Sequence, residues 1–185
     1  LDSSDYLDGL IEQEIFTMAY WGNVCMDDDY GSVNVPAIHL GGWYDCFLEG
    51  TLEGFMGYQH DGGPGAAGLS KLIIGPWRHG GTESLVQGEL TYPANSQGTF
   101  SFTMFLDMFA YSLGVANTYA SWPTVSYYVM GDVTDPLAPG NEWEYAADWP
   151  PPATEKTWYF HYNDRLSIDL PTGSYKSYLY TPHNP

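Results

Sequence analysis

The fold of this 185-residue chain is decided by the stretch Val35–Asp45, VPAIHLGGWYD. It is a short apolar run that breaks at Gly41-Gly42 and then presents a carboxylate. A brief apolar run that breaks at glycine predicts a buried strand, formed by Val35, Ala37, Ile38 and Leu40. We expect this strand to stop at the glycine pair and to deliver Asp45 just beyond its carboxyl end.

A second stretch of the same design follows at Lys71–His79, KLIIGPWRH. Its apolar run predicts another buried strand, which we expect to stop at Gly75-Pro76 and to deliver His79. In open parallel α/β sheets, catalytic groups collect just beyond the carboxyl ends of the strands. The two stretches therefore predict a site that combines an acid with a histidine.

The spacing between Asp45 and His79 agrees with a pair of neighbouring parallel strands. The 34 positions that separate them leave room for one crossover helix, which we expect at about Leu48–Gln59 from its apolar periodicity. The Gly- and Pro-rich stretch Asp61–Gly68 then returns the chain to the sheet. Two adjacent loops would let the side chains meet. A turn residue at position 45 and a solvated loop histidine at position 79 are the alternatives.

The strings GGWYD (41–45) and IIGPWRHGG (73–81) resemble the CocE/NonD family of serine hydrolases. This family includes cocaine-esterase-like acyl esterases, X-Pro dipeptidyl peptidases and α-amino-acid ester hydrolases. An acid followed by a histidine is also the order of the last two members of the α/β-hydrolase triad. The resemblance implies that Asp45 is the triad acid and His79 the base. It also implies a substrate-contacting role for Phe47, although aromatic residues at helix starts mostly serve packing.

The resemblance extends from Val35 to the end of the chain. It includes FLDMFAYSLGVAN at Phe105–Asn117, VSYYVMG at Val125–Gly131 with the later Trp143 and Trp149-Pro150-Pro151, and SYLYTPHNP at Ser177–Pro185, where Thr181 replaces a common aspartate. It implies an α/β fold, namely the C-terminal part of an α/β-hydrolase domain followed by the start of a β jelly-roll domain. We expect a helical cap-like segment over residues 1–34, the hydrolase part over 35–120 and the galactose-binding-like jelly roll over 121–185.

Local patterns fill in this outline. Residues 7–21 carry an apolar stripe at helical spacing, and Trp21 resembles a family tryptophan of the cap. A helix is expected at Phe102–Leu113, closed by Gly114. Short aromatic-rich strands are expected at Thr124–Met130, Thr157–Tyr162 and Tyr175–Tyr180. The aromatic residues of these strands are interpreted as the core of a β-sandwich, with a sugar-binding face as the alternative.

The triad nucleophile is missing, because no Gly-x-Ser-x-Gly occurs in the sequence. The near matches ANSQG (94–98) and AYSLG (110–114) are rejected, since Ser96 falls in a loop and Ser112 near a helix end. Both serines also follow the acid and the base. We expect the serine and the oxyanion donors upstream of Leu1 or on a second chain, and the 185-residue piece alone to be inactive. The alternative is a non-catalytic secreted, acidic binding or structural module that retains a hydrolase remnant.

The amino-acid composition limits the classes of partner that the protein can bind. The net charge of −18, from 23 acidic and 5 basic residues, disfavours nucleic acid and anionic membrane surfaces. We expect a small-molecule ester or amide substrate, no metal or organic cofactor, and leave a homo-oligomer open. The acidity is explained by solubility or by a salty or extracellular setting, and a secreted or periplasmic location is favoured over others.

Two further features bear on disulfide bonding and metal binding. Cys25 and Cys46 form either a disulfide or two unpaired buried thiols, and their spacing makes no metal site. The run Asp27-Asp28-Asp29 could bind a cation, but the alternating ligands of a calcium loop are missing. A solvated loop is the favoured interpretation.

Overall fold

The computed structural model describes residues 25–26, 29–97, 102–173, 177 and 179. The apolar stripe of residues 7–21, Trp21, Asp27-Asp28 and most of the strand expected at Tyr175–Tyr180 lie outside the described residues. The chain divides into two compact units, Leu1–Pro150 and Pro151–Pro185. The described elements of the first unit are η1 (Tyr30–Ser32), β1 (Ile38–Tyr44), α3 (Leu48–Met56), η2 (Gly57–Asp61), β2 (Lys71–Arg78), β3 (Val86–Gln87), β4 (Leu90–Thr91), η3 (Ala94–Gln97), α4 (Phe102–Ser112), η4 (Thr118–Ser121), β5 (Val125–Val129) and β6 (Glu142–Ala146). Those of the second unit are β7 (Tyr159–His161) and β8 (Arg165–Ser167).

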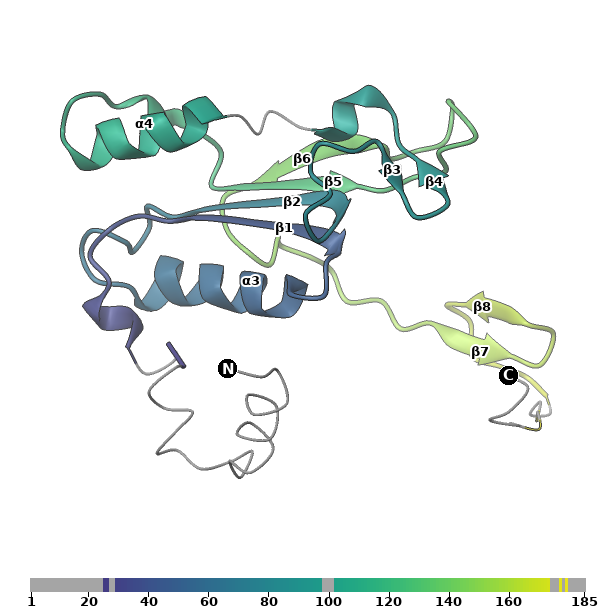
Figure 1. The fold of residues 1–185 in the computed structure, drawn as a ribbon. Helices are drawn as coiled ribbons and strands as arrows, with labels where there is room; N and C mark the ends of the chain where they lie inside the picture. Colours follow the sequence, from purple (N-terminus) through teal and green to yellow (C-terminus); the bar gives the residue numbers. More distant parts are fainter. Residues whose placement is uncertain (1–24, 27–28, 98–101, 174–176, 178, 180–185) are drawn as a thin grey trace, which may run out of the picture. The chain divides into compact units, whose positions relative to one another are not determined.

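The first unit is organised around a four-stranded sheet with the order β1-β2-β5-β6 (Figure 1). β1 pairs with β2 in parallel, from Ile38 opposite Lys71 to Gly42 opposite Gly75. β5 adds to the other side of β2 in parallel, and β6 closes this edge in antiparallel orientation. The predicted pair of neighbouring parallel strands joined by a helix is confirmed.

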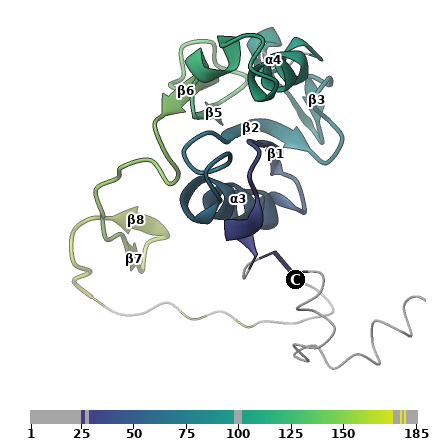
Figure 2. The same ribbon diagram turned by 90° about the vertical axis from the view of Figure 1, so that its left-hand side faces the viewer.

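Helices cover both faces of this sheet, α3 on one side and α4 on the other (Figures 1 and 2). The side chains of β2 alternate between the two layers, as strand geometry requires. Leu72 and Ile74 pack with Phe55 of α3, whereas Ile73 packs with Met104 of α4. All residues of β2 except its last are buried. Because both faces are covered, the strand is apolar from Leu72 to Trp77, between Lys71 and Arg78.

The two central strands pass through their glycines, so the prediction that they stop there is wrong. β1 continues to Tyr44 and β2 to Arg78. A Cβ on Gly42 would overlap the backbone carbonyl of Trp77, and a Cβ on Gly75 would overlap the Trp77 indole ring. Glycine is required here because backbone and ring approach too closely for any side chain.

Both predicted helices are present, but their C-terminal ends differ from the prediction. α3 begins at Leu48 as expected and passes after Met56 into a π-helical turn, η2, that ends at Asp61. α4 ends one residue before the predicted Leu113. The strands expected at Thr124–Met130 and Thr157–Tyr162 contain β5 and β7.

The sheet continues past residue 121, where we expected the jelly roll to begin. β5 and β6 both lie beyond that position, yet they extend the sheet of β1 and β2. The first compact unit accordingly reaches Pro150. In the second unit β7 and β8 form a two-stranded antiparallel sheet. A jelly-roll domain in this part of the protein stays a prediction.

Candidate active site

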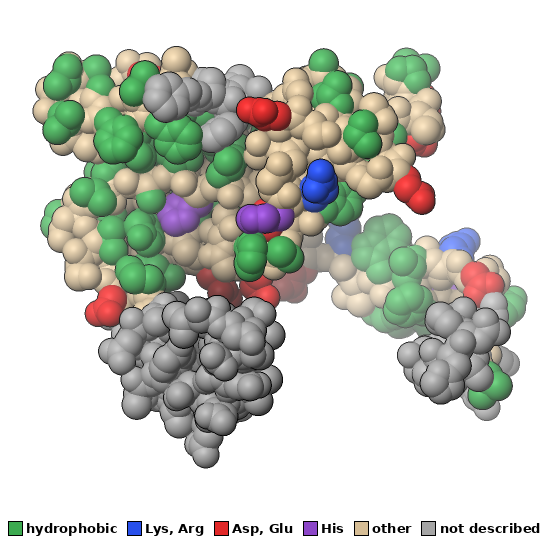
Figure 3. All heavy atoms as spheres, viewed as in Figure 1, with side chains coloured by type: hydrophobic (Ala, Val, Ile, Leu, Met, Phe, Trp, Pro, Cys, Tyr) green, Lys and Arg blue, Asp and Glu red, His purple; other side chains and the backbone are tan. Residues whose placement is uncertain are grey.

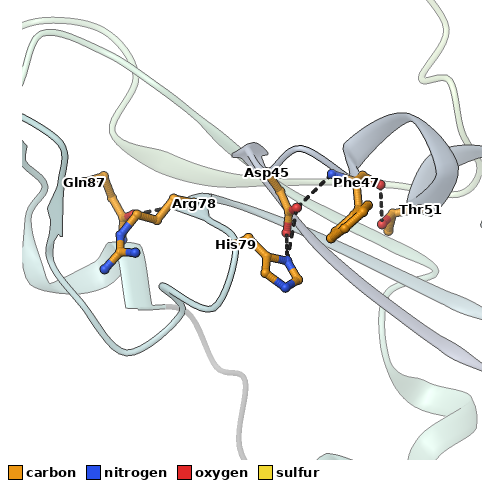
Figure 4. A network of polar contacts seen from close by, with 6 residues as sticks. All are labelled: Asp45, Phe47, Thr51, Arg78, His79 and Gln87. Carbon is orange, nitrogen blue, oxygen red and sulfur yellow. Dashed lines mark hydrogen bonds and ion pairs between the residues drawn. The ribbon is translucent and has the colours of Figure 1, made fainter. Parts of the chain in front are cut away.

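The structure brings Asp45 and His79 into direct contact at the carboxyl ends of β1 and β2 (Figure 4). Nδ1 of His79 lies 3.1 Å from Oδ2 and 3.2 Å from Oδ1 of Asp45. The contact follows from the topology, because parallel neighbouring strands end at the same edge of the sheet. The adjacency expected from the sequence is therefore observed, and the catalytic roles of the two residues remain predictions.

The start of α3 fixes the Asp45 side chain. Oδ1 accepts a hydrogen bond of 2.9 Å from the backbone N–H of Phe47, and the backbone carbonyl of Asp45 accepts one of 3.2 Å from Leu48. Only 12% of the Asp45 side chain is exposed. A carboxylate beside the first turn of a helix is further favoured by the partial positive charge of the free N–H groups.

The surroundings of Asp45 favour its ionised form. Desolvation raises the pKa of the carboxyl, but the Phe47 N–H, the hydrogen bond and charge of His79 and the Cys46 thiol together outweigh it. The net direction of the pKa is therefore downward. Asp45 is suited to remain a charged acceptor for the histidine at neutral pH.

The His79 ring is accessible, with 67% of its side chain exposed. The Phe47 ring and the His79 ring form a T-shaped pair, with 5.0 Å between centroids and 79° between planes. Because Nδ1 faces a carboxylate, we assign the ring proton to Nδ1 as the donor. Nε2 forms no hydrogen bond to any residue that the structure describes. This nitrogen is therefore the one open to a reacting group.

Neither serine that the sequence analysis rejected contacts this pair within the described part of the chain. Ser96 in η3 is 1% exposed, and its backbone carbonyl accepts the indole N–H of Trp77. The Ser112 hydroxyl donates to the carbonyl of Met108 at the end of α4. Burial and helix position agree with the exclusion of both as nucleophiles.

The two cysteines are free and exposed, so neither a disulfide nor the alternative of buried thiols is found. Asp29 lies in a turn before η1, and the other two residues of the aspartate run are outside the described part. Among the described residues, no group of three His, Cys, Asp or Glu side chains is placed to hold a metal ion. Within the same residues, no helix combines the length and apolar character that a membrane span requires.

Other notable features lie away from the pair. A cavity of about 560 Å³ between the sheet and α4 is lined by residues that include Lys71 and Trp143, but by neither Asp45 nor His79. In Figure 3 the histidine side chains stand out on a face where few basic residues are visible.

Sequence reasoning missed Gln87, a buried side chain behind the loop that carries His79. Nothing in its local sequence marks it, because its contacts depend on the folded loop.

Comparisons with known proteins agree with the residues that suggested a family. Residues 3–81 match the family model described as X-Pro dipeptidyl-peptidase (S15 family). Cocaine esterase of Rhodococcus sp. (strain MB1 Bresler) is 25% identical over 182 residues, which are 89% of this chain and 29% of the relative. A candidate serine esterase of Mycobacterium bovis is 28% identical over 133 residues, 70% of this chain and 18% of the relative.

The same similarity is found in three dimensions. A solved structure of an alpha-amino acid ester hydrolase labelled with selenomethionine superimposes with a TM-score of 0.60 at 21% identity. The match covers 90% of this chain and 27% of that structure, and it shows an α/β-hydrolase-like fold. The family-model match, the cocaine esterase relative and the solved structure together support a CocE/NonD-like family member, and the matched relatives are hydrolases of the esterase and peptidase classes. The chain spans less than a third of the length of these relatives.

Proposed function

We propose that the protein is a serine hydrolase that cleaves ester or amide bonds, with Asp45 and His79 as the acid and base of its triad. The observation that carries this proposal is the contact between Nδ1 of His79 and the Asp45 carboxylate, with Nε2 left accessible. A histidine held in this way on a carboxylate is the recurring base of acyl-transfer enzymes.

The proposed mechanism assigns one proton to each step. Nε2 of His79 takes the proton of a serine hydroxyl as the oxygen attacks the substrate carbonyl carbon. The imidazolium then gives that proton to the leaving alcohol or amine, and a water molecule repeats the sequence to release the acid. Asp45 stays ionised throughout, keeps the other proton on Nδ1 and stabilises the imidazolium. Acyl transfer through serine requires no metal or organic cofactor.

The nucleophile is proposed to come from polypeptide outside these 185 residues, together with the oxyanion donors. Two observations support this: no Gly-x-Ser-x-Gly occurs in the chain, and the chain matches only 29% of the cocaine esterase sequence. The 185-residue chain by itself is then inactive. We further propose that Phe47 contacts the substrate, since its exposed ring lies against His79. Residues 151–185 are proposed as the start of the jelly roll.

Labelling of the native protein with a fluorophosphonate probe tests this function. We expect one labelled serine, located by peptide mapping within a Gly-x-Ser-x-Gly sequence outside the present chain. A label on a second polypeptide that co-purifies would assign the nucleophile to a partner chain. Absence of labelling and of ester hydrolysis would refute the proposal and favour a non-catalytic binding or structural module. A label on Ser96 or Ser112 would overturn the assignment of the nucleophile.

A further inference from the structure

The loop that carries His79 needs an anchor, because the imidazole itself has few neighbours. Its side chain is 67% exposed, and its described contacts are the Asp45 carboxylate and the Phe47 ring. Neither contact fixes the backbone on which the ring is mounted. The loop must therefore be held from its other side if Nδ1 is to stay at 3.1 Å from the acid.

The amide of Gln87 supplies this anchor. Oε1 accepts the backbone N–H of Arg78 at 2.9 Å, and Nε2 donates to the carbonyls of Gly81 at 2.9 Å and Ser84 at 2.8 Å. Both N–H groups of the amide and one lone pair of its oxygen are thus engaged with the loop backbone. Arg78 immediately precedes His79, and Gly81 and Ser84 follow it (Figure 4 shows the bond to Arg78).

Gln87 is itself held in place. It lies at the end of β3, where the short β3–β4 hairpin pairs it with Leu90, and its side chain is 5% exposed. The loop also carries backbone hydrogen bonds of its own, from Gly81 to Arg78 and from Ser84 to Gly81. A buried amide whose hydrogen bonds are all to one loop acts as a rigid template, because moving the loop would leave buried polar groups without partners.

We propose that Gln87 is a positioning residue for His79, which holds the loop so that the imidazole stays on Asp45 and presents Nε2 to the substrate. This inference rests on the proposed function. Gln87 acts through His79 and makes no contact of its own with the reacting atoms. A displacement of about 1 Å in a catalytic base can cost on the order of 10²-fold in rate. Loss of the amide is therefore expected to reduce kcat and to leave KM nearly unchanged.

The test compares Gln87→Leu and Gln87→Glu with Gln59→Leu in the native enzyme. Gln59→Leu is a matched control, because Oε1 of Gln59 accepts a backbone N–H at Ser70, before β2 and away from His79. Gln87→Glu keeps the acceptor for Arg78 but replaces both donors with an oxygen that faces two carbonyls. We expect kcat to fall about 10- to 100-fold in both Gln87 variants, with KM within twofold, and no such fall in the control.

A second readout separates positioning from general loss of stability. In ¹⁵N-edited NMR spectra, the Nδ1 proton that His79 shares with Asp45 should be lost or broadened in the Gln87 variants and kept in Gln59→Leu. Unchanged kcat and an unchanged Nδ1 signal in folded Gln87→Glu would overturn the positioning role. If the wild-type enzyme hydrolyses esters, that result leaves the proposed function standing. If the wild type is neither active nor labelled, the proposed function fails, and the NMR signal alone decides whether Gln87 holds the pair.

Discussion

Gly42 of β1 lies directly against the backbone carbonyl of Trp77 of β2, and no side chain fits between them. The two residues stand three and two positions before Asp45 and His79, respectively. The closeness of the strands at this point therefore sets the distance between the acid and the histidine. Beyond it the register of the strands shifts, and Tyr44 pairs with Arg78.

Gly42→Ala is expected to destabilise the protein and to abolish hydrolysis. The added methyl group must push the strands apart, at a cost of about 1–3 kcal/mol or more. Urea unfolding and ester turnover measure the two effects. Gly50→Ala in α3 is the matched control, because a Cβ there meets no atom within 4 Å and should stabilise the helix by about 0.5–1 kcal/mol. Equal unfolding midpoints for the two variants would contradict the steric account.

Asp45→Asn is expected to lower kcat by about 10⁴-fold while the fold persists. An amide can present its NH₂ group to Nδ1, which favours the wrong tautomer of His79 and no longer stabilises the imidazolium. The protein offers a second His–Asp contact as a control, since Nε2 of His60 lies 2.8 Å from Oδ1 of Asp148. Asp148→Asn should keep turnover within a fewfold of the wild type. Steady-state kinetics that show the same loss in both variants would argue against a special role for Asp45.

Phe47→Ala is expected to raise KM by roughly 2- to 10-fold, which corresponds to the loss of one aromatic contact. The side chain is 62% exposed, so the free energy of unfolding should change by less than about 0.5 kcal/mol. Phe109→Ala on α4 removes an equally accessible ring, 58% exposed, and should leave KM unchanged. An unaltered KM in Phe47→Ala would remove this residue from the substrate site.

His39 makes the stability depend on pH. Its Nε2 is buried with no partner among the described residues, and its ring packs on Phe55 and Tyr58. Burial lowers its pKa from 6.5 to about 4. Between these values the unfolded state binds a proton that the folded state does not. The neutral, buried His39 therefore contributes roughly 3 kcal/mol to the free energy of unfolding. This contribution is complete above pH 6.5 and is lost as the pH falls through about 4.

His39→Phe should flatten this dependence. Urea midpoints of the variant are expected to fall less between pH 7 and pH 4.5 than those of the wild type. His161→Phe, which removes a histidine from the second unit, should keep the wild-type slope. Parallel curves for wild type and His39→Phe would show that this histidine does not control the acid sensitivity.

Much of the site could be predicted because it depends on short, continuous stretches of sequence. The apolar runs before Asp45 and His79, and the helix between them, define a parallel pair whose ends must meet. The strand ends could not be predicted, since a glycine that admits a neighbouring backbone looks the same in sequence as one that ends a strand. Only the contacts of Gly42 and Gly75 with Trp77 distinguish the two cases.

The remaining differences come from long-range pairing. Val125–Val129 has the aromatic and β-branched residues of a sandwich strand. In the structure it nevertheless pairs with β2, along the edge opposite β1. The local sequence pattern predicts that a segment forms a strand, but it does not predict the strand with which that segment pairs. Gln87 left no signal for the same reason, because its three hydrogen bonds exist only after the loop has closed.

The role of His79 as the base is tested most directly by the rate at which a fluorophosphonate probe modifies the serine in wild type, His79→Ala and His60→Ala. His60 is the matched control because it also contacts an aspartate. We expect labelling at least about 10³-fold slower in His79→Ala and unchanged in His60→Ala, since only His79 activates the nucleophile. Equal labelling rates in wild type and His79→Ala would contradict the assignment of His79 as the base.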